Sequence, residues 1–411
     1  MAIRVIRDVR MLNLDQPEDD GRYSVVVENG LIREIKEGDL HIDGAEVIEG
    51  KGRTLMPGMI DCHVHVIASV ANLGTNGRLP NTFAVLRAVP ILNGMLRRGF
   101  TTVRDAGGAD FALARSIEDG VIAGPRLFIA GKALSQTGGH GDFRDRFDNS
   151  DPDPCGCCRN LGAIGRIVDG VDEVRKAVRE EMRGGANQIK IMASGGVASQ
   201  TDPIGNLQFS IDEIKAIVEE ATSHQTYVMA HAYTSAAIKR VVELGVRTIE
   251  HGNLVDDAAA QTMAKAGAYM VPTLVTYDAM MRVGAQVGVP ALALEKNEIV
   301  RMKGIEALET LKRNNVKMGL GTDLLGDMHE FQNDELTIRA RVLGNLEVLR
   351  QATLNGAEII GKQGVLGVVA EGAIADLLLV DGNPLSDISV LTGQGERIDM
   401  VMKEGKIIRL R

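Results

Sequence analysis

Apolar and polar positions change their spacing repeatedly along the chain between residue 54 and about residue 361. Short, nearly continuous apolar runs, which are typical of buried strands, alternate with segments whose apolar positions recur at the period of an α-helix. Two such helical segments are residues 171–185 and 210–225, and the second begins with Ser210 and Glu213 at the spacing of a capping box. This alternation predicts parallel βαβ units.

Eight segments have the strand pattern, which is the number that closes a (β/α)8 barrel. A doubly wound open sheet is the competing architecture, but no glycine-rich dinucleotide-binding fingerprint follows the first strand. We therefore expect an α/β fold in which residues 56–361 form a (β/α)8 TIM barrel. The eight predicted strands are residues 59–66, 101–107, 126–131, 188–194, 226–233, 247–252, 269–274 and 316–323.

The two ends of the chain have a different pattern. Residues 24–35 read SVVVENGLIREI, two β-type runs joined by Asn29 and Gly30, a dipeptide that favours a hairpin turn. After residue 362 come further short apolar runs separated by glycines, among them GAIADLLLVDGNPL and VMKEGKII. We expect residues 1–55 and 362–411 to combine into one small β-sandwich domain built from both termini.

Composition narrows the class of protein. The 411 residues are 45% hydrophobic and 25% charged, which is typical of a soluble globular chain. A net charge of −9 and an aromatic content of 3% argue against nucleic acid or an anionic membrane as a partner. The N-terminus lacks the apolar core of a signal peptide, and no apolar run is long enough to span a bilayer. These features favour a cytoplasmic location.

Three of the four cysteines, Cys155, Cys157 and Cys158, form a cluster within the polar stretch DNSDPDPCGCCRN. A closed structural zinc site needs four ligands, and the chain contains no second cysteine pair to complete one. We therefore expect reduced thiols in a long surface loop.

Two histidines, His63 and His65, stand two residues apart in the first predicted strand. Alternate side chains of a strand project to the same face, so both imidazoles would converge on one point. A metal ion is the commonest reason to hold two neutral imidazoles together. If the pair stood alone, two unrelated histidines near a strand end would be the better interpretation.

Three further candidate ligands lie at the ends of other predicted strands. His231 ends the fifth, His251 the sixth and Asp323 the eighth. In a (β/α)8 barrel the carboxyl ends of all strands meet at one rim, where the chemistry takes place. The coincidence of five such residues from four strands therefore predicts a metal site at this rim.

Lys190 lies between two isoleucines in the fourth predicted strand. Burial lowers the pKa of a lysine, and the neutral amine can react with carbon dioxide to give a carbamate that bridges two metal ions. The alternative is an ammonium group paired with a carboxylate such as Asp323. Chemistry alone leaves both possibilities open.

The motifs PGMIDCHVH, HAY, EHG and GTD, together with the lysine of the fourth strand, resemble those of the amidohydrolase superfamily of metal-dependent hydrolases. The terminal segments resemble the split β-sandwich of that superfamily, so the resemblance covers essentially the whole chain. It implies two zinc ions bridged by carboxylated Lys190. One ion would be held by His63, His65 and Asp323, and the other by His231 and His251.

The segments ALSQTGGHGDF and ASGGVAS are similar to those of the imidazolonepropionase-related branch, which includes prolidase-type dipeptidases. The resemblance implies hydrolysis of the amide bond of dipeptides, such as Xaa-Pro, or of N-acyl amino acids, by a homo-oligomer. The alternatives are a carboxypeptidase for Xaa-Arg or Xaa-Lys, a cyclic-amide hydrolase of the imidazolonepropionase type, deamination, and a non-catalytic scaffold. The intact ligand set argues against the scaffold.

The positions of three residues suggest roles in catalysis and substrate binding. Asp323 would accept a proton from a metal-activated water molecule and pass it to the departing amine. Tyr233, two residues after His231, would donate a hydrogen bond to the substrate carbonyl, or else it is a packing residue. His140, in the glycine-rich loop after the third strand, would contact the substrate, since its glycine neighbours allow close approach of the backbone, or else it is a simple loop histidine.

Several other polar residues are expected to be structural or exposed. Arg144, Arg146 and Arg159 could bind a substrate carboxylate, but each alone is better interpreted as a solvated charge. Asp105, at the end of the second strand, is interpreted as a supporting or structural residue. His329 is expected in a surface loop.

Overall fold

The computed structural model describes residues 3–149, 160–199 and 201–411. Parallel strands form the barrel wall in two groups. β6, β7 and β8 pair in that order, and β11, β12, β13 and β14 pair in theirs. The backbone N–H of Asn187 donates to the carbonyl of Ile129 (2.7 Å), which joins the two groups. These strands are β6 (Met59–Val64), β7 (Phe100–Asp105), β8 (Arg126–Ile129), β11 (Ile189–Met192), β12 (Val228–Thr234), β13 (Thr248–Leu254) and β14 (Tyr269–Val271).

The eighth predicted strand, residues 316–323, closes the barrel as an irregular segment rather than as a regular strand. The N–H of Gly319 donates to Met270 of β14 (2.9 Å), and the N–H of Cys62 in β6 donates to Leu320 (2.7 Å). Glycine is required at position 321, because a Cβ there would lie 2.5 Å from a methyl group of Val271. The segment fills the gap between two strands without continuing a regular ladder with either.

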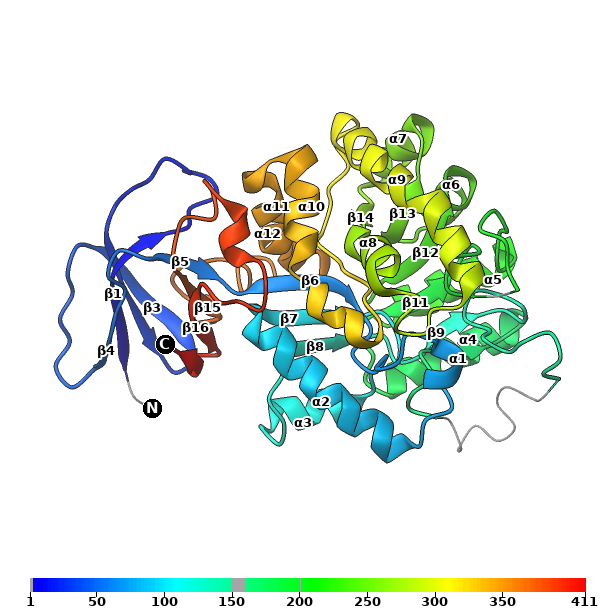
Figure 1. Ribbon diagram of the computed structural model, residues 1–411, viewed down its shortest axis with the longest axis horizontal. Helices are drawn as coiled ribbons and strands as arrows, with labels where there is room; N and C mark the ends of the chain where they lie inside the picture. The colour runs from blue at the N-terminus through cyan, green and yellow to red at the C-terminus, as the bar shows by residue number, and fades with distance from the viewer. Residues whose placement is uncertain (1–2, 150–159, 200) are drawn as a thin grey trace.

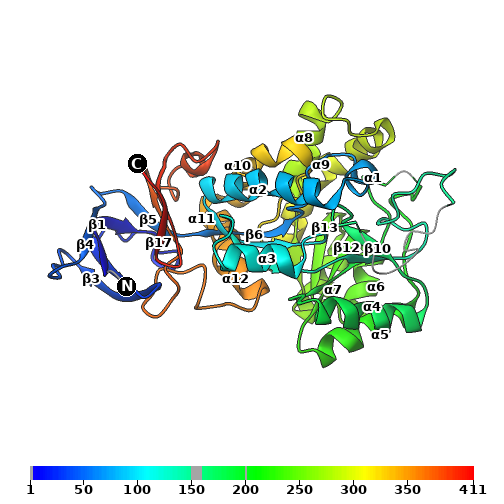
Figure 2. The same cartoon turned by 90° about the horizontal axis from the view of Figure 1, so that it is seen from below.

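Helices surround the barrel wall, as Figures 1 and 2 show. Helix α5 begins with the predicted capping box, in which Ser210 and Glu213 satisfy each other's backbone N–H groups. The helices are α1 (Leu73–Asn76), α2 (Asn81–Arg97), α3 (Phe111–Glu118), α4 (Val171–Arg183), α5 (Ile211–Ser223), α6 (Ser235–Glu243), α7 (Asp257–Ala266), α8 (Leu274–Val283), α9 (Ala291–Arg313), α10 (Asp334–Leu343), α11 (Asn345–Ala352) and α12 (Leu354–Ile359), with 3-10 helices η1 (Gly326–Phe331) and η2 (Ile388–Leu391).

Strands from both termini form a second sheet beside the barrel. Figure 1 shows the N-terminal strands, in blue, and the C-terminal strands, in red, on the same side of the molecule and apart from the barrel. β5 is parallel to β1 and antiparallel to β15, so it joins the N-terminal strands to the C-terminal ones. These strands are β1 (Arg4–Met11), β2 (Tyr23–Glu28), β3 (Leu31–Glu37), β4 (Glu46–Glu49), β5 (Thr54–Pro57), β15 (Leu377–Val380), β16 (Ile398–Lys403) and β17 (Lys406–Leu410).

The terminal sheet has an apolar core of its own, to which both ends of the chain contribute. Val25, Leu55, Leu377 and Met400 are members of this core and are fully buried. The predicted hairpin between β2 and β3 is present, with positive φ at Asn29 (54°) and Gly30 (84°). The expected TIM barrel with a β domain from both termini is therefore confirmed, whereas the exact division at residues 55 and 361 stays a prediction.

Two short strands extend the barrel wall. β9 (Ala133–Ser135) pairs with β11, and β10 (Gly165–Ile167) pairs with β9. The glycine-rich loop that contains His140 lies between these two strands, so it begins and ends beside the barrel mouth. Within the described ranges, helices are too short or too polar to cross a bilayer.

Candidate metal and substrate site

The six side chains predicted to bind metal line one cavity at the carboxyl ends of the barrel strands. His63 and His65 come from β6 and the residue that follows it, and Lys190 comes from β11. The other three are His231 in β12, His251 in β13 and Asp323 at the end of the irregular eighth segment. Tyr233 and His140 line the same cavity.

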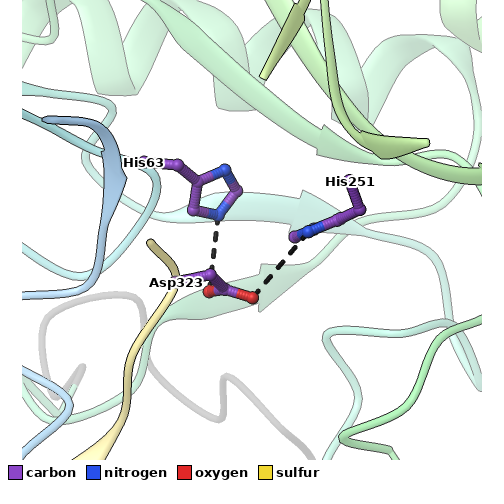
Figure 3. Close-up of side chains that lie close together, drawn as sticks. All are labelled: His63, His251 and Asp323. Carbon is purple, nitrogen blue, oxygen red and sulfur yellow. Dashed lines mark ion pairs between the residues drawn. The ribbon is translucent and has the colours of Figure 1, made fainter. Parts of the chain in front are cut away.

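Asp323 lies at the centre of this group. Its Oδ1 is 3.5 Å from Nε2 of His63 and 3.3 Å from Nε2 of His65, and its Oδ2 is 3.9 Å from Nδ1 of His251. Figure 3 shows His63 and His251 pointing toward this carboxylate from two different strands, β6 and β13. His63, His251 and Asp323 each offer a ligand atom within 4.8 Å of the others. Both His251 (φ 74°) and Asp323 (φ 52°) have left-handed backbone conformations, which are strained for these residues and often mark functional sites.

The first two histidines are oriented by hydrogen bonds behind them. Nδ1 of His63 donates to the carboxylate of Glu250 (2.7 Å), and Nδ1 of His65 donates to the carbonyl of Gly107 (2.8 Å). Nε2 of His63 is buried and has no hydrogen-bond partner among the described residues. A buried nitrogen lone pair of this kind fits a metal ion, since an unpaired buried polar atom is otherwise costly.

Burial sets the protonation of His231, His251 and Lys190. It holds the pKa of both His231 and His251 well below the usual range, so both imidazoles are neutral and carry a lone pair. Burial also lowers the pKa of Lys190 to about 8, so a sizeable fraction of the amine is neutral near pH 7 to 8. A neutral amine is what carbamate formation requires. The donor set of imidazole nitrogens and a carboxylate suits zinc.

A buried ion pair between Arg104 and Glu250 holds His63 in place. The guanidinium of Arg104 donates to both carboxylate oxygens of Glu250 (3.0 and 3.1 Å), and both side chains are fully buried. Burial alone would raise the pKa of Glu250, but Arg104 and His63 outweigh it and lower the pKa to about 2. Glu250 is therefore a carboxylate that can only accept, and His63 must carry its proton on Nδ1.

Tyr233 lies on the same side of β12 as His231, because the strand continues to Thr234. Its ring contacts His231 edge-on (centroids 5.0 Å apart) and stacks on His251 (5.3 Å). Its hydroxyl is 2.7 Å from that of Tyr277 on α8. Burial raises the pKa of Tyr233 well above its usual value, so the hydroxyl keeps its proton.

His140 stacks on His231, with ring centroids 4.2 Å apart and an interplanar angle of 24°. The structure therefore places His140, which was predicted to contact the substrate, against His231, which was predicted to bind metal. Other cavity walls are apolar: Leu73, Phe143, Ile164, Val197, Met280 and Leu325.

His329 differs from its prediction. It is only 5% exposed, in η1, and its Nε2 lies 3.3 Å from the carbonyl of Ala68. The N–H of Gly326 also donates to Ala68 (2.9 Å), which folds η1 back onto the loop after β6 and buries the ring. The expectation of a surface loop is therefore wrong for this residue.

The remaining polar residues have the following positions. The Asp105 carboxylate accepts from the backbone N–H groups of Val66 (2.9 Å) and Gly107 (3.0 Å), as a structural residue would. Arg144 pairs with Asp142 (2.7 Å), and Arg146 is exposed. Arg159 and the cysteine cluster 155–158 lie outside the described residues.

Sequence reasoning missed Glu250, Arg104 and Tyr277. Arg104 and Glu250 carry charge inside apolar strands, TTVRDAG and RTIEHG, which is the signal that could have identified them as a buried pair. Tyr277 follows the seventh strand within a helix, and nothing in its local sequence indicates that it meets Tyr233.

Comparison with known proteins agrees with this architecture. The model of the amidohydrolase family matches residues 54–408. A crystal structure of a prolidase complexed with N-methylphosphonate-L-proline is 55% identical, covers both chains completely and superposes with a TM-score of 0.98. A Xaa-Pro dipeptidase crystallised with methionine in its active site is 28% identical over 99% of this chain and 100% of that chain, with a TM-score of 0.86. Ochratoxinase from Aspergillus niger is 32% identical over 86% of this chain and 75% of the relative.

The chain thus belongs to the amidohydrolase family, and the family resemblance is confirmed. It is a hydrolase of carbon–nitrogen bonds that acts on small-molecule substrates. Members of this family generally use divalent metal ions, and His63, His251 and Asp323 form a possible site for one.

Proposed function

We propose that this protein is a binuclear zinc amidohydrolase that cleaves the amide bond of dipeptides or N-acyl amino acids, with proline on the leaving side. The observation that carries the proposal is the full-length likeness to a prolidase that binds a phosphonate of L-proline. The cavity of this chain supports it, because the proposed metal ligands lie in one part of it and apolar side chains line much of the rest.

Six residues would hold the metal. His63, His65 and Asp323 would bind one zinc ion, His231 and His251 the other, and Lys190 as its carbamate would bridge them. When bound, zinc supplies a Lewis acid that makes water more acidic and polarises a carbonyl oxygen. The lowered pKa of Lys190 supports carbamate formation, since only the neutral amine reacts with carbon dioxide.

The protein's own side chains would then move protons and orient the substrate. A carboxylate oxygen of Asp323 accepts a proton from the attacking water molecule and passes it to the amide nitrogen as the carbon–nitrogen bond breaks. Tyr233, which remains protonated, donates a hydrogen bond to the substrate oxygen. His140, stacked on His231, contacts the substrate.

A substrate screen tests the proposal. Protein loaded with zinc in the presence of bicarbonate should hydrolyse Xaa-Pro dipeptides and N-acyl-prolines, contain about two zinc equivalents, and lose activity on chelation. Dipeptides ending in arginine or lysine and cyclic amides should react far more slowly. Turnover restricted to either of these classes would contradict the proline assignment, and no hydrolysis of any amide would contradict the function itself.

Substitution of Asp323 by Asn tests its role in proton transfer. Asp323→Asn should lower kcat by about 10²- to 10⁴-fold, because an amide cannot accept the proton. Zinc content measured on the purified variant should change little. Asp327→Asn is the matched control, since this carboxylate lies exposed four residues away. Full activity of Asp323→Asn would rule out proton transfer by Asp323.

A further inference from the structure

The loop that follows β11, described at residues 194–199 and 201–208, folds over one wall of the cavity. Ser194 pairs with Leu207 in an antiparallel bridge, and the N–H of Gly195 donates to Asn206 (2.9 Å), so the loop returns to the barrel where it left. Val197 and Ala198 from this loop line the cavity. The loop is therefore placed to act on whatever binds there.

Three residues of this loop hold His140, which belongs to a different loop. Nδ1 of His140 is 3.0 Å from the hydroxyl of Ser199 and 3.5 Å from the carboxylate of Asp202. The backbone N–H of His140 donates to the amide oxygen of Gln208 (2.9 Å). The ring also lies so close to Gly196 that a Cβ there would be 2.3 Å from it.

Asp202 is the centre of this arrangement. It is 2% exposed, and the Gln208 amide group donates to the same oxygen that faces His140 (2.9 Å). A carboxylate can only accept hydrogen bonds, so the placement of Asp202 and Ser199 at Nδ1 favours the tautomer of His140 that carries its proton there. The other ring nitrogen, Nε2, has no hydrogen bond within the described part of the chain and remains available to a ligand.

Lys296 on α9 fixes the backbone of the loop from the other side. Its ammonium group donates to the carbonyls of Gly196 (3.0 Å), Ser199 (2.9 Å) and Asp202 (2.6 Å). It is also 4.0 Å from the Asp202 carboxylate, whose negative charge it faces. Lys296 thus fixes the backbone of Ser199 and Asp202, whose side chains lie at Nδ1 of His140.

We propose that Asp202, held in place by Lys296, is a positioning residue that sets the tautomer and orientation of His140 so that Nε2 faces the substrate. The proposal rests on the proposed function only for the identity of the substrate that His140 contacts. The orientation of the ring is a property of the protein itself, so it can be measured without any substrate.

Nitrogen NMR of the imidazole tests the tautomer directly. In the zinc-loaded wild-type protein, the His140 ring, assigned with His140→Ala, should show its proton on Nδ1. In Asp202→Ala the Ser199 hydroxyl is free to donate to Nδ1, so the proton should move to Nε2. Asp202→Asn keeps an oxygen at this position and should retain the wild-type signal. An unchanged tautomer in Asp202→Ala would overturn the proposal.

Kinetics of a double-mutant cycle test whether Asp202 acts through His140. Asp202→Ala should raise KM about tenfold, change kcat less than about threefold and leave zinc content unchanged, whereas Asp202→Asn should restore KM. In a His140→Ala background, Asp202→Ala should change kcat/KM less than about twofold. Equal losses in both backgrounds would assign Asp202 a merely structural role and overturn the proposal.

A second variant covers the possibility that Asp202→Ala fails to fold. Lys296→Met should raise KM several-fold at unchanged zinc content and shift the His140 signals. Lys303→Met, on an exposed turn of the same helix, is the control and should change neither. Unchanged KM and unchanged ring signals in Lys296→Met would remove Lys296 from the proposal. If the wild-type protein cleaves no amide, the proposed function fails, yet the NMR result still decides whether Asp202 sets the ring.

Discussion

At the scale of single residues, a buried ion pair between Arg104 and Glu250 supports the proposed metal ligand His63. Arg104 is fully buried and donates to the carbonyl of Cys62 (2.6 Å) as well as to Glu250. Glu250 compensates this charge and also accepts from His63. The same carboxylate therefore stabilises a buried cation and aims the imidazole of a proposed metal ligand.

Replacing Glu250 by Gln should weaken both functions. Gln is neutral, so it leaves Arg104 buried without a compensating charge, which costs about 3–5 kcal/mol for such pairs. It also holds His63 Nδ1 less firmly, so zinc affinity should fall about 10- to 100-fold. Chelator competition measures the affinity, and thermal melting of the metal-free protein measures the stability.

Glu306→Gln is the control for this variant, since Glu306 is an exposed carboxylate on α9. It should leave zinc affinity and the melting temperature nearly unchanged. Zinc affinity of Glu250→Gln equal to that of the wild type would show that His63 is oriented without Glu250.

At the scale of elements, the spacing of hydrophobic residues predicted which segments form strands, but it did not predict the residue at which each strand ends. The seventh strand was predicted to reach residue 274, but β14 ends at Val271. Pro272 follows and has no N–H to donate to a ladder, and α8 begins at Leu274. The positions of the histidines of β6, β12 and β13 could be predicted because they lie near the carboxyl ends of their strands, and these ends meet at one rim of a (β/α)8 barrel.

The irregular eighth segment could not be predicted, because its cause lies elsewhere in the chain. Arg339 of α10 donates to the carbonyl of Gly319 (2.9 Å) and to that of Pro272, so a helical side chain takes acceptors that a regular ladder would use. The position of Asp202 beside His140 likewise depends on Lys296 from a distant helix. Local sequence contains no signal for contacts of this kind.

At the scale of the whole molecule, ion pairs join the terminal sheet to the barrel. Arg126 of β8 contacts Asp376 (2.6 Å) before β15 and Glu404 (2.7 Å) in the turn after β16. The pair with Asp376 is mostly buried, so it is screened less than a surface pair. Arg126 therefore attaches the C-terminal strands to the barrel, which makes their separate unfolding unfavourable. The homo-oligomeric state and the cytoplasmic location stay predictions.

The pH dependence of the free energy of unfolding should reflect the titration of the buried His329. Burial lowers its pKa from 6.5 to about 3, so the unfolded chain binds this proton before the folded protein does. Stability should therefore fall as pH decreases from about 6.5 toward 3, with His329 contributing up to about 1.4 kcal/mol per pH unit. His329→Gln, which can still donate to Ala68 but cannot titrate, should lose stability less steeply over this range. His41→Gln, at an exposed position, is the control and should follow the wild-type curve. Melting temperatures of the metal-free proteins between pH 4 and 8 provide the measurement, and parallel curves for wild type and His329→Gln would contradict the assignment.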